Sequence, residues 1–365
     1  MTTTTTRAAV YIGTNQLQIR DVTLREPGPG EVRVRIGASG VCGSDRHVID
    51  GEWQMPSPTI MGHEGAGVVD AVGEGVTSLE AGDHVIMTWF YPCGSCTSCR
   101  QGRTWVCTGS NSEACLLPDG TSPLELDGAP AYPYLAVGSM SEYVVVAEQA
   151  AIRVPDEVPF DVAALIGCSI ATGVGAVVND ARVQPGRSAV VIGAGGVGLS
   201  IIMGLALAGA SPIIAVDVND DALELARSFG ATHTVRSGAD LPERVREIVQ
   251  DGADFAFEAI GRPETIALMP ATLQRGGTAV VVGLPPEGQP VPIDVLALAE
   301  EGKSLLGSNY GATVPARDFP MLARLYLNGR LPIDRLITNR FSLDEVNDAF
   351  DLMRAGAKGR SVLIF

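Results

Sequence analysis

The chain has no excess of basic residues and no apolar run that reaches the length of a membrane span. Its 26 Lys and Arg are outnumbered by 42 Asp and Glu, and the net charge of −16 should repel nucleic acid and anionic membranes. The longest apolar candidate, residues 199–210, is shorter than the roughly 18 residues that a membrane-spanning helix requires. The first six residues are mostly threonine and lack the apolar core of a signal peptide, so we expect a frayed tail. These absences predict a cytoplasmic protein that binds neither nucleic acid nor membrane.

The cysteines do not form the even set that a disulfide framework requires. There are seven, and four of them follow the pattern C-x2-C-x2-C-x7-C, which can surround one tetrahedral ion as a closed structural site. An iron–sulfur cluster could use four thiolates, but the proline that follows the last cysteine in ferredoxin runs is missing. We predict a structural zinc, with a cluster or an unmetallated loop as the alternatives, bound by Cys93, Cys96, Cys99 and Cys107. Cys115 belongs to no metal set, and its role stays open.

A second set of metal-binding side chains is spread along the sequence. His63 and Glu64 stand between glycines in the segment Gly62–Gly67, Cys42 lies 21 residues before His63, and Cys168 follows far downstream. Two thiolates and one imidazole are the three-ligand set of a catalytic zinc whose fourth position is open to water or substrate. The alternative is a buried histidine with two inert core cysteines. We predict a zinc site, because acidic and hydroxyl side chains flank the ligands.

The 365 residues are enough for two domains, and the hydrophobic periodicity changes between the two halves of the sequence. Up to about residue 151, short apolar runs alternate with Gly and Pro, which predicts the strands of a partly open β-barrel. The stretch 109–138 is rich in Gly, Pro, Asp and Ser and is expected to form a long loop. After residue 168, strands alternate with helices, which is typical of a parallel sheet with crossover helices. From about residue 310 the chain should return to the first domain.

A glycine-rich turn follows the first strand of the predicted parallel sheet and opens a helix. Its glycines would let the backbone approach a pyrophosphate held at the helix N-terminus, and the motif comprises Gly193, Gly195, Gly196, Val197 and Gly198. Asp217 ends the next strand, where a carboxylate accepts hydrogen bonds from adenosine ribose hydroxyls and repels a 2′-phosphate. The motif therefore predicts NAD rather than NADP, and a glycine-rich turn without a nucleotide is the alternative.

Together these motifs resemble those of the zinc-dependent medium-chain dehydrogenases, the alcohol dehydrogenase family. The matching segments are Gly62-His63-Glu64-x-x-Gly67, the four-cysteine lobe, Gly193–Gly198 with Asp217, and Lys358-Gly359-Arg360. The segment 117–122 is similar to the branch that includes class III enzymes and their actinobacterial relatives. The resemblance implies an α/β protein with a GroES-like β-barrel catalytic domain and a doubly wound parallel-sheet (Rossmann) domain that binds NAD. The catalytic domain would comprise residues 1–169 and 310–365, and it would include the structural zinc lobe at 93–107. The NAD-binding domain would comprise residues 170–309.

The resemblance also implies catalytic roles for four residues beside the zinc ligands. Glu64 would lie behind the metal and coordinate it transiently, and Asp45 would accept a hydrogen bond from His63, which fixes the tautomer of that ligand. Ser44 would touch the substrate oxygen and pass its proton through a cofactor ribose hydroxyl to His47. The alternatives are a helix cap for Asp45, a turn hydroxyl for Ser44 and a surface histidine for His47.

Cofactor contacts are implied for two further residues. Thr172 would pack on the nicotinamide and Arg360 would reach the pyrophosphate, with a solvent-facing charge as the alternative for Arg360. Gly43 stands where relatives often carry a cation that assists the pyrophosphate. The class III enzymes also carry an Arg at the position of Asn111, where it grips a carboxylate of the glutathione substrate.

The activity implied is reversible oxidation of a primary alcohol to its aldehyde, with hydride transfer from a zinc-bound alkoxide to NAD. The substrate pocket would be lined by Trp53, Trp89, Leu284 and, from a partner subunit, Tyr310, which suits an apolar, aromatic or terpenoid alcohol. The alternatives are a formaldehyde dehydrogenase that depends on mycothiol or glutathione, and a non-catalytic or zinc-free nucleotide-binding protein. We expect two zinc ions per chain and a homodimer that pairs through the strand at 304–308, with a tetramer as the alternative.

Overall fold

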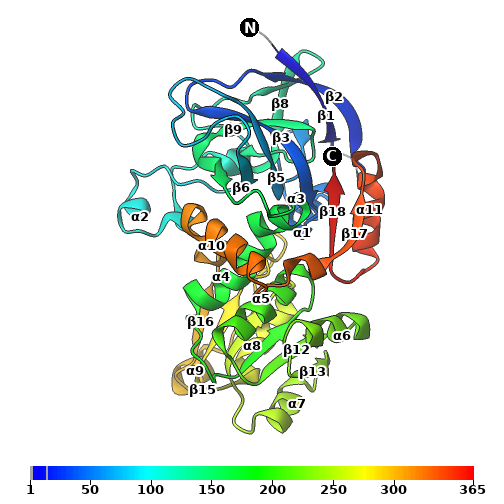
Figure 1. The fold of residues 1–365 in the computed structure, drawn as a ribbon. Helices are drawn as coiled ribbons and strands as arrows, with labels where there is room; N and C mark the ends of the chain where they lie inside the picture. The colour runs from blue at the N-terminus through cyan, green and yellow to red at the C-terminus, as the bar shows by residue number, and fades with distance from the viewer. Residues whose placement is uncertain (1–2, 14) are drawn as a thin grey trace. The chain divides into compact units, whose positions relative to one another are not determined.

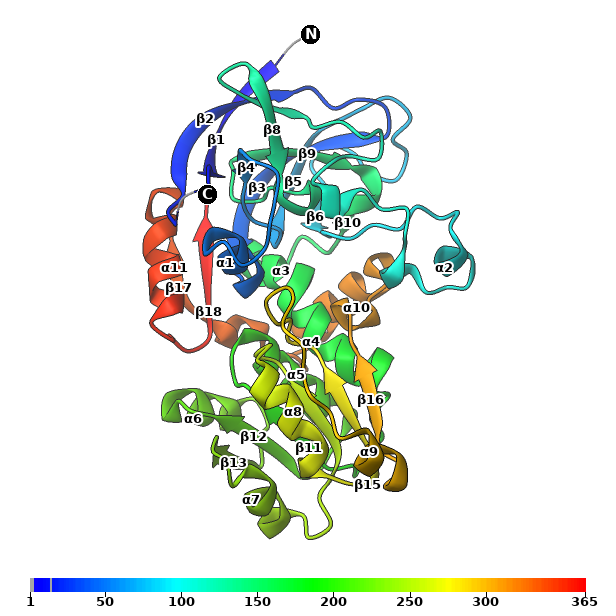
Figure 2. The same cartoon turned by 180° about the vertical axis from the view of Figure 1, so that it is seen from behind.

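The computed structural model describes residues 3–13 and 15–365, and packing divides the chain into two compact units (Figures 1 and 2). The first unit contains the chain up to Cys168 together with Val314–Phe365, and the second contains Ser169–Thr313. The predicted domain boundaries were at 169 and 310. Residues 310–313 belong to the second unit because the 3-10 helix η7, Tyr310–Ala312, packs on α4 (Ala171–Gly175) and η6 (Ala176–Asp180).

The first unit combines a closed barrel with a second sheet. The barrel has the strand order β1-β2-β7-β8-β4, formed by Thr3–Tyr11, Gln18–Arg25, Leu124–Leu126, Ala129–Pro133 and Thr59–Ile60. The prediction of a partly open barrel was therefore wrong, because the segment expected to be a long loop contains β7 and β8. These two short strands pair with each other, with β2 and with β4, and so complete the circle.

The expectation of a frayed tail is wrong for Thr3–Thr6, which belong to the first strand, and residues 1–2 lie outside the described residues. Thr3–Thr6 pair in register with β2, from Thr3 opposite Arg25 to Thr6 opposite Val22. Threonine is β-branched and suits a pleated, half-buried strand. The Thr6 side chain is fully buried and accepts a hydrogen bond from the Tyr143 backbone N–H at 3.0 Å.

The second sheet of the first unit brings the C-terminus beside the N-terminal half. It has seven strands in the order β10-β6-β5-β3-β18-β17, with β9 on β3. Their bounds in that order are Ala151–Arg153, His84–Met87, Gly65–Val72, Glu31–Gly40, Arg360–Ile364, Ile337–Phe341 and, for β9, Tyr143–Ala147. Strand β18 runs antiparallel to β3, with Val362 opposite Gly40, and Figures 1 and 2 show this red strand within the first unit. This pairing places Arg360 close to the end of β3.

Short helices connect the strands of the first unit. The α-helices are α1 (Gly43–Ile49), α2 (Thr97–Arg100), α3 (Phe160–Leu165), α10 (Pro315–Leu327) and α11 (Val346–Arg354). The 3-10 turns are η1 (Thr104–Val106), η2 (Ser112–Ala114), η3 (Tyr134–Ala136), η4 (Glu148–Ala150), η8 (Ile333–Leu336) and η9 (Leu343–Glu345). Helices α10 and α11 lie in the C-terminal part of the chain, after it returns to the first unit at Val314.

The second unit is a six-stranded parallel sheet with crossover helices. The strand order is β13-β12-β11-β14-β15-β16, so the first strand in the chain, β11, lies inside the sheet and the order reverses there. The strands are Ala189–Ile192 (β11), Ile213–Asp217 (β12), His233–Arg236 (β13), Ala253–Glu258 (β14), Leu273–Val281 (β15) and Ser304–Gly307 (β16). The helices are α5 (Gly196–Ala208), α6 (Asp220–Ser228), α7 (Leu241–Ile248), α8 (Pro263–Thr272) and α9 (Val295–Glu300). This is the doubly wound architecture that the sequence predicts, and such sheets bind ligands where the strand order reverses.

One continuous helical segment, Phe160–Asp180, contains two π-helical stretches, η5 (Ile166–Ile170) and η6. It is the one helix among the described residues long and apolar enough to cross a membrane, which corrects the expectation that no such stretch exists. However, 83% of its most apolar part is buried inside the protein, as in the core helices of many folds. π turns occur often at functional sites, and Cys168 lies on η5.

Candidate functional site

Four potential metal ligands converge inside the first unit. The ligand atoms of Cys42, His63, Glu64 and Cys168 all lie within 4.8 Å of one another, and all four residues are buried. The three predicted zinc ligands therefore meet at one centre, with Glu64 beside them. Sulfur, nitrogen and oxygen ligands of these types are the ones that zinc binds.

Three elements bring the ligands together. Cys42 directly precedes α1 and follows β3, His63 follows β4, and Cys168 lies on the π turn η5. The turn before His63 requires glycine at position 62, where φ is +92° and a Cβ would lie 2.5 Å from the Met140 backbone nitrogen. The ligand positions thus depend on backbone turns as well as on the ligands themselves.

Asp45 organises the centre from the first turn of α1. Its carboxylate accepts hydrogen bonds from the Cys42 N–H at 3.3 Å, the Gly62 N–H at 3.1 Å and the His63 ring at 3.3 Å. When His63 donates through Nδ1, its Nε2 lone pair is left for a metal, and Nε2 is buried without a hydrogen-bond partner among the described residues. An orphaned buried nitrogen beside two thiols fits a zinc ligand well.

Tyr134 contacts two functional residues, although it was not among the site residues predicted from the sequence. Its hydroxyl donates to the Ser44 carbonyl at 3.2 Å, and its ring meets the His63 ring edge-on with centroids 5.5 Å apart. Tyr134 is fully buried, and burial raises the pKa of its hydroxyl well above the usual value, so it remains a donor. Its distance from Ser44 in sequence, 90 residues, leaves no local signal that could have identified it.

Glu64 forms a buried ion pair with Arg360. The Arg360 guanidinium donates to Glu64 Oε2 at 2.5 Å and to the Val41 carbonyl at 3.0 Å. A Cβ at position 40 would lie 1.9 Å from Glu64 Oε2, so only glycine leaves room for this carboxylate. Burial raises the pKa of Glu64 to about 7 despite the opposing effect of Arg360. Glu64 Oε1 is buried without a partner among the described residues, which leaves one oxygen for a metal.

Arg360 is therefore not the solvent-facing charge that was the alternative interpretation. Its side chain is 6% exposed, and its guanidinium is held by Glu64. A contact between Arg360 and a cofactor pyrophosphate stays a prediction.

The pKa values of the two thiols of the centre are shifted in opposite directions. A hydrogen bond from Cys168 lowers the pKa of Cys42, with further lowering by His63 and Arg360, whereas the same hydrogen bond raises the pKa of Cys168. Burial opposes a charged His63, but Asp45 raises the pKa of that ring well above its usual value. A divalent cation would replace these protons and let both sulfurs act as thiolates. The residues present fit a zinc ion.

Ser44 and His47 lie three residues apart on α1, so they share one face of that helix. The His47 ring is hydrogen-bonded through Nδ1 to the Glu52 carboxylate and stacks on Trp53 with centroids 4.5 Å apart. His47 is thus held by two neighbours, and its role in the proton path stays a prediction, with a surface histidine as the alternative.

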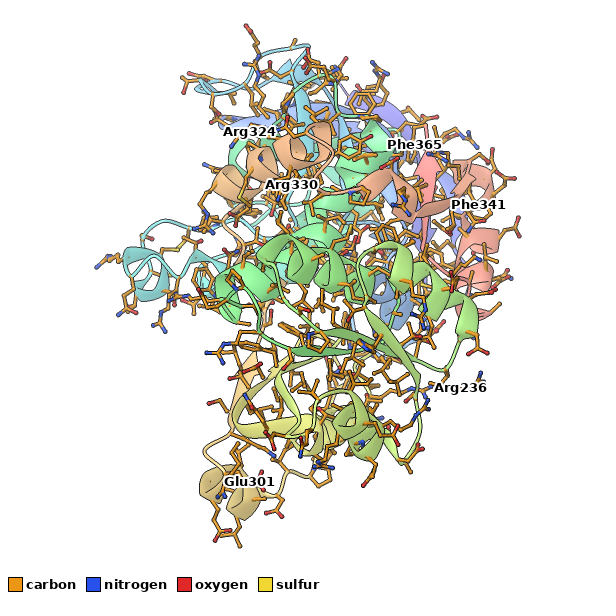
Figure 3. All side chains as sticks on the ribbon, turned by 60° about the horizontal axis from the view of Figure 1, so that its bottom comes forward. Arg236, Glu301, Arg324, Arg330, Phe341 and Phe365 are labelled. Atoms are coloured by element: carbon orange, nitrogen blue, oxygen red, sulfur yellow. The ribbon has the colours of Figure 1, made fainter. Side chains whose placement is uncertain are left out.

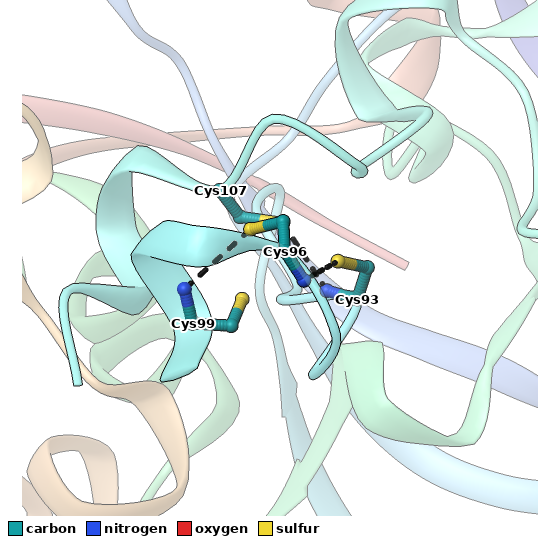
Figure 4. Close-up of side chains that lie close together, drawn as sticks. All are labelled: Cys93, Cys96, Cys99 and Cys107. Atoms are coloured by element: carbon teal, nitrogen blue, oxygen red, sulfur yellow. Dashed lines mark hydrogen bonds between the residues drawn. The ribbon is translucent and has the colours of Figure 1, made fainter. Parts of the chain in front are cut away.

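The four lobe cysteines form the second metal group. The ligand atoms of Cys93, Cys96, Cys99 and Cys107 lie within 4.8 Å of one another, and Figure 4 shows the backbone N–H groups that point at their sulfurs. The N–H groups of Cys93 and Gly109 donate to Cys107 Sγ at 3.2 and 3.3 Å. Backbone hydrogen bonds, chiefly from Cys99, lower the pKa of Cys96 to about 5. These thiolate-stabilising contacts fit the predicted structural zinc.

The second unit contains the predicted dinucleotide motif at the C-terminal end of β11. Gly193 has φ of +96°, and a Cβ on Gly198 would lie 1.8 Å from the Gly193 carbonyl oxygen, so both positions require glycine. Helix α5 begins at Gly196, and Gly195 and Val197 flank its first residue. The motif therefore opens a helix whose N-terminus can receive a phosphate.

Asp217 lies at the end of β12 with its carboxylate held in place. The Ala194 N–H donates to Oδ2 at 2.7 Å and the Asn219 N–H donates to Oδ1 at 2.9 Å. Arg236, whose side chain is labelled in Figure 3, is opposite Asp217 in the β12–β13 register. Its guanidinium is paired with Asp220 at 2.8 Å. A fixed carboxylate beside the motif favours ribose hydroxyls over a 2′-phosphate.

The predicted pocket residues are divided between the two units. Trp53 and Trp89 are half-buried and pack on the same hydrophobic cluster of the first unit. Leu284 is 56% exposed and Thr172 is half-buried, both in the second unit. Tyr310 is 3% exposed within its own chain, and its expected place in the pocket of a partner subunit stays a prediction.

Comparisons with known proteins agree with this geometry. The family described as the alcohol dehydrogenase GroES-like domain matches residues 28–156, and the zinc-binding dehydrogenase family matches residues 196–328. The chain belongs to the zinc-dependent medium-chain alcohol dehydrogenase family, and its fold and its zinc and NAD cofactors are those of that family.

Individual relatives are similar over their full length. The chain is 38% identical to an S-(hydroxymethyl)glutathione dehydrogenase of Paracoccus denitrificans and 39% identical to a class-3 alcohol dehydrogenase of Cereibacter sphaeroides, covering 99% of this chain and 100% of each relative. Among solved structures, an alcohol dehydrogenase zinc-binding domain protein from Burkholderia ambifaria superposes with a TM-score of 0.94 at 37% identity, over 100% of both chains. A benzyl alcohol dehydrogenase from Acinetobacter calcoaceticus also has a TM-score of 0.94, at 34% identity over 99% of both chains.

Proposed function

We propose that this NAD-dependent alcohol dehydrogenase oxidises the hydroxymethyl adduct of formaldehyde with a low-molecular-weight thiol. The buried group Cys42, His63 and Cys168, with Ser44 and His47 on the helix α1 that follows Cys42, carries the proposal for the chemistry. The curated relatives, which are named for S-(hydroxymethyl)glutathione and class-3 activity, favour this substrate over a free aromatic alcohol.

The proposed chemistry removes one proton and one hydride from a primary carbinol. Zinc, when bound, supplies a Lewis acid that lowers the pKa of the substrate hydroxyl. Ser44 would accept the hydroxyl proton and pass its own proton toward His47, and NAD, when bound, would supply the hydride acceptor. Glu64 is placed to offer Oε1 to the metal while ligands exchange, and Asp45 keeps His63 in the metal-binding tautomer.

A free apolar or aromatic primary alcohol is the second candidate substrate. The benzyl alcohol dehydrogenase relative and the half-buried indoles of Trp53 and Trp89 favour it. Asn111, at the position where the class III resemblance implies an Arg for glutathione, donates to the carbonyls of Leu117 and Pro118 at 3.1 and 3.3 Å. It therefore holds its own loop and offers no cation to a substrate carboxylate, so a thiol other than glutathione fits the lead proposal better.

A substrate panel decides between the two candidates. Initial rates of NADH formation are measured with formaldehyde plus glutathione, formaldehyde plus mycothiol, and benzyl, straight-chain and terpenoid alcohols without thiol. The lead proposal expects the highest kcat/KM with formaldehyde and one thiol, and no formaldehyde oxidation when the thiol is omitted. Faster oxidation of a free alcohol than of every thiol adduct would reverse the order of the candidates.

The same proposal includes a homodimer in the cytoplasm. Strand β16 pairs with β15 on one side, and its residue Leu305 is 45% exposed, so the strand can extend the sheet into a second copy. A tetramer is the alternative. Seven free thiols, of which six belong to the two metal groups, suit a reducing compartment.

A further inference from the structure

Helix α1 ends in a turn that folds the chain back over His47. The Gly51 N–H donates to the Val48 carbonyl at 3.0 Å, and the Glu52 N–H donates to the His47 carbonyl at 2.8 Å. Gly51 has φ of +76°, the left-handed conformation that this helix-ending motif requires. The motif places Glu52 and Trp53 beside the ring of His47.

Both side chains then hold the ring. The Glu52 carboxylate is hydrogen-bonded to His47 Nδ1, and the Trp53 indole stacks on the imidazole with an interplanar angle of 20°. The His47 side chain is 14% exposed, whereas the Glu52 side chain is 38% exposed and in contact with solvent. The carboxylate is therefore the side of the pair that faces water.

The other charged groups at this helix end are occupied elsewhere. Asp50 pairs with Arg354 at 2.6 Å and lies 3.7 Å from the Arg46 side chain. Arg354 also binds Asp351 at 2.8 Å. Among these carboxylates, Glu52 is therefore the one that binds His47.

We propose that Glu52 is a positioning residue for the proton path, an inference that rests on the function proposed above. By accepting Nδ1–H, Glu52 fixes the tautomer in which Nε2 of His47 carries the lone pair that receives the proton. When a substrate hydroxyl proton reaches Nε2, the Glu52 carboxylate keeps the Nδ1 proton hydrogen-bonded and stabilises the imidazolium, which then releases the Nε2 proton to water. One proton leaves the substrate and one enters solvent, while NAD, when bound, would take the hydride, so His47 returns to its Nδ1–H tautomer and Glu52 is unchanged.

The first test observes the ring directly and needs no turnover. The chain has four histidines, so 15N-histidine NMR of the full-length protein can resolve His47. We expect the Nδ1–H tautomer in the unsubstituted protein and in Glu52→Gln, whose amide oxygen can still accept, and a shift toward Nε2–H in Glu52→Ala. An unchanged tautomer in Glu52→Ala would overturn the positioning role.

The second test measures proton release in the zinc-loaded enzyme, with NAD and the fastest substrate of the panel above. At low buffer concentration kcat should fall roughly threefold in Glu52→Gln and about tenfold in Glu52→Ala, with KM changed less than about twofold, because a positioned proton acceptor contributes to kcat. Added imidazole should restore most of the loss. Asp50→Asn, at the same helix end but paired with arginines, is the matched control and should show no imidazole response.

The outcomes separate the two proposals. Loss of kcat in the Glu52 variants without rescue by imidazole, or a loss confined to KM, would assign Glu52 a structural role only and overturn this inference. If the unsubstituted enzyme oxidises no substrate of the panel, the proposed function fails, while the NMR experiment still decides whether Glu52 sets the tautomer.

Discussion

Asp45 binds three groups of the candidate metal centre with a single carboxylate. Two of its partners are backbone N–H groups, those of Cys42 and Gly62, and the third is the ring of His63. The carboxylate is fully buried, so each of these bonds is protected from water. The side chain therefore links the loop that carries one sulfur ligand to the loop that carries the nitrogen ligand.

Replacing Asp45 by Asn should weaken zinc binding at this centre by about 10- to 100-fold, because the amide has the same shape but cannot orient His63 as a charged acceptor. Zinc competition with a chelator, monitored by metal analysis, measures the change. Asp156→Asn, an exposed carboxylate of the same unit, is the control and should retain normal affinity. Equal zinc affinity in both variants would show that Asp45 does not support the ligand.

Two cysteines should differ sharply in reactivity. Burial raises the pKa of Cys115 to about 11, whereas backbone N–H groups, chiefly that of Ser95, lower the pKa of exposed Cys93 to about 7. At pH 8 in metal-free protein, Cys93 is therefore mostly thiolate and Cys115 mostly thiol, and the thiolate is the form that reacts. Mass spectrometry after brief iodoacetamide treatment should show Cys93 modified and Cys115 intact, with Cys93 protected once zinc is added. Faster labelling of Cys115 would contradict this assignment.

At the residue scale the sequence predicts the ligands and the support from Asp45, but not the supports that come from distant parts of the chain. The zinc ligands occur in recognisable motifs, so Cys42, His63 and Cys168 could be identified from the sequence alone. By contrast, the Glu64–Arg360 ion pair joins residues 296 apart in the chain, and the Tyr134–Ser44 bond joins residues 90 apart. Such contacts depend on strand pairing and have no local pattern.

At the scale of elements, the cofactor motif and its carboxylate are fixed by adjacent strands. Strands β11 and β12 are parallel neighbours, which brings the glycine turn after β11 to the residue that ends β12. The Ala194 N–H then bonds directly to the Asp217 carboxylate. This local geometry explains why the motif and its acidic partner could be predicted from spacing alone.

Replacing Asp217 by Gly should shift the preference from NAD toward NADP by at least about tenfold, because the repulsion between the carboxylate and the 2′-phosphate is removed. A tenfold shift corresponds to about 1.4 kcal/mol. Arg236, opposite Asp217 in the neighbouring strand, would then be a candidate cation for a 2′-phosphate. The ratio of kcat/KM for the two cofactors measures the shift, with Asp251→Asn, an exposed carboxylate of the same unit, as the control. If the ratio does not change, Asp217 does not contact the ribose.

The elements that were predicted wrongly are short or depend on pairing. Strands β7 and β8 have three and five residues and lie in a segment rich in turn residues, so their composition indicates a loop. In the structure they form strands because they pair with each other and close the barrel. Thr3–Thr6 become a strand because β2 offers a partner in register. The strands and helices of the second unit alternate regularly along the chain, and the predicted parallel sheet with crossover helices is confirmed.

At the scale of the whole molecule, the chain divides its functional groups between two compact units. The first unit holds both candidate metal groups, and the second holds the dinucleotide motif. Strand β18, from the end of the chain, completes the first unit by pairing with β3, and so delivers Arg360 to Glu64. The metal centre therefore depends on the return of the chain to the first unit, because the returning segment carries Arg360.

The most direct test of this account is the zinc content of the purified protein and of Cys168→Ser, measured by mass spectrometry of the metal together with alcohol oxidation. The account predicts about two zinc ions per chain in the unsubstituted protein. It predicts about one in Cys168→Ser, because the closed lobe site keeps its zinc, and this variant should lose alcohol oxidation. Cys96→Ser should also bind about one zinc but lose stability rather than the active centre. Two zinc ions and undiminished oxidation in Cys168→Ser would contradict the assignment of Cys42, His63 and Cys168 as the catalytic metal centre.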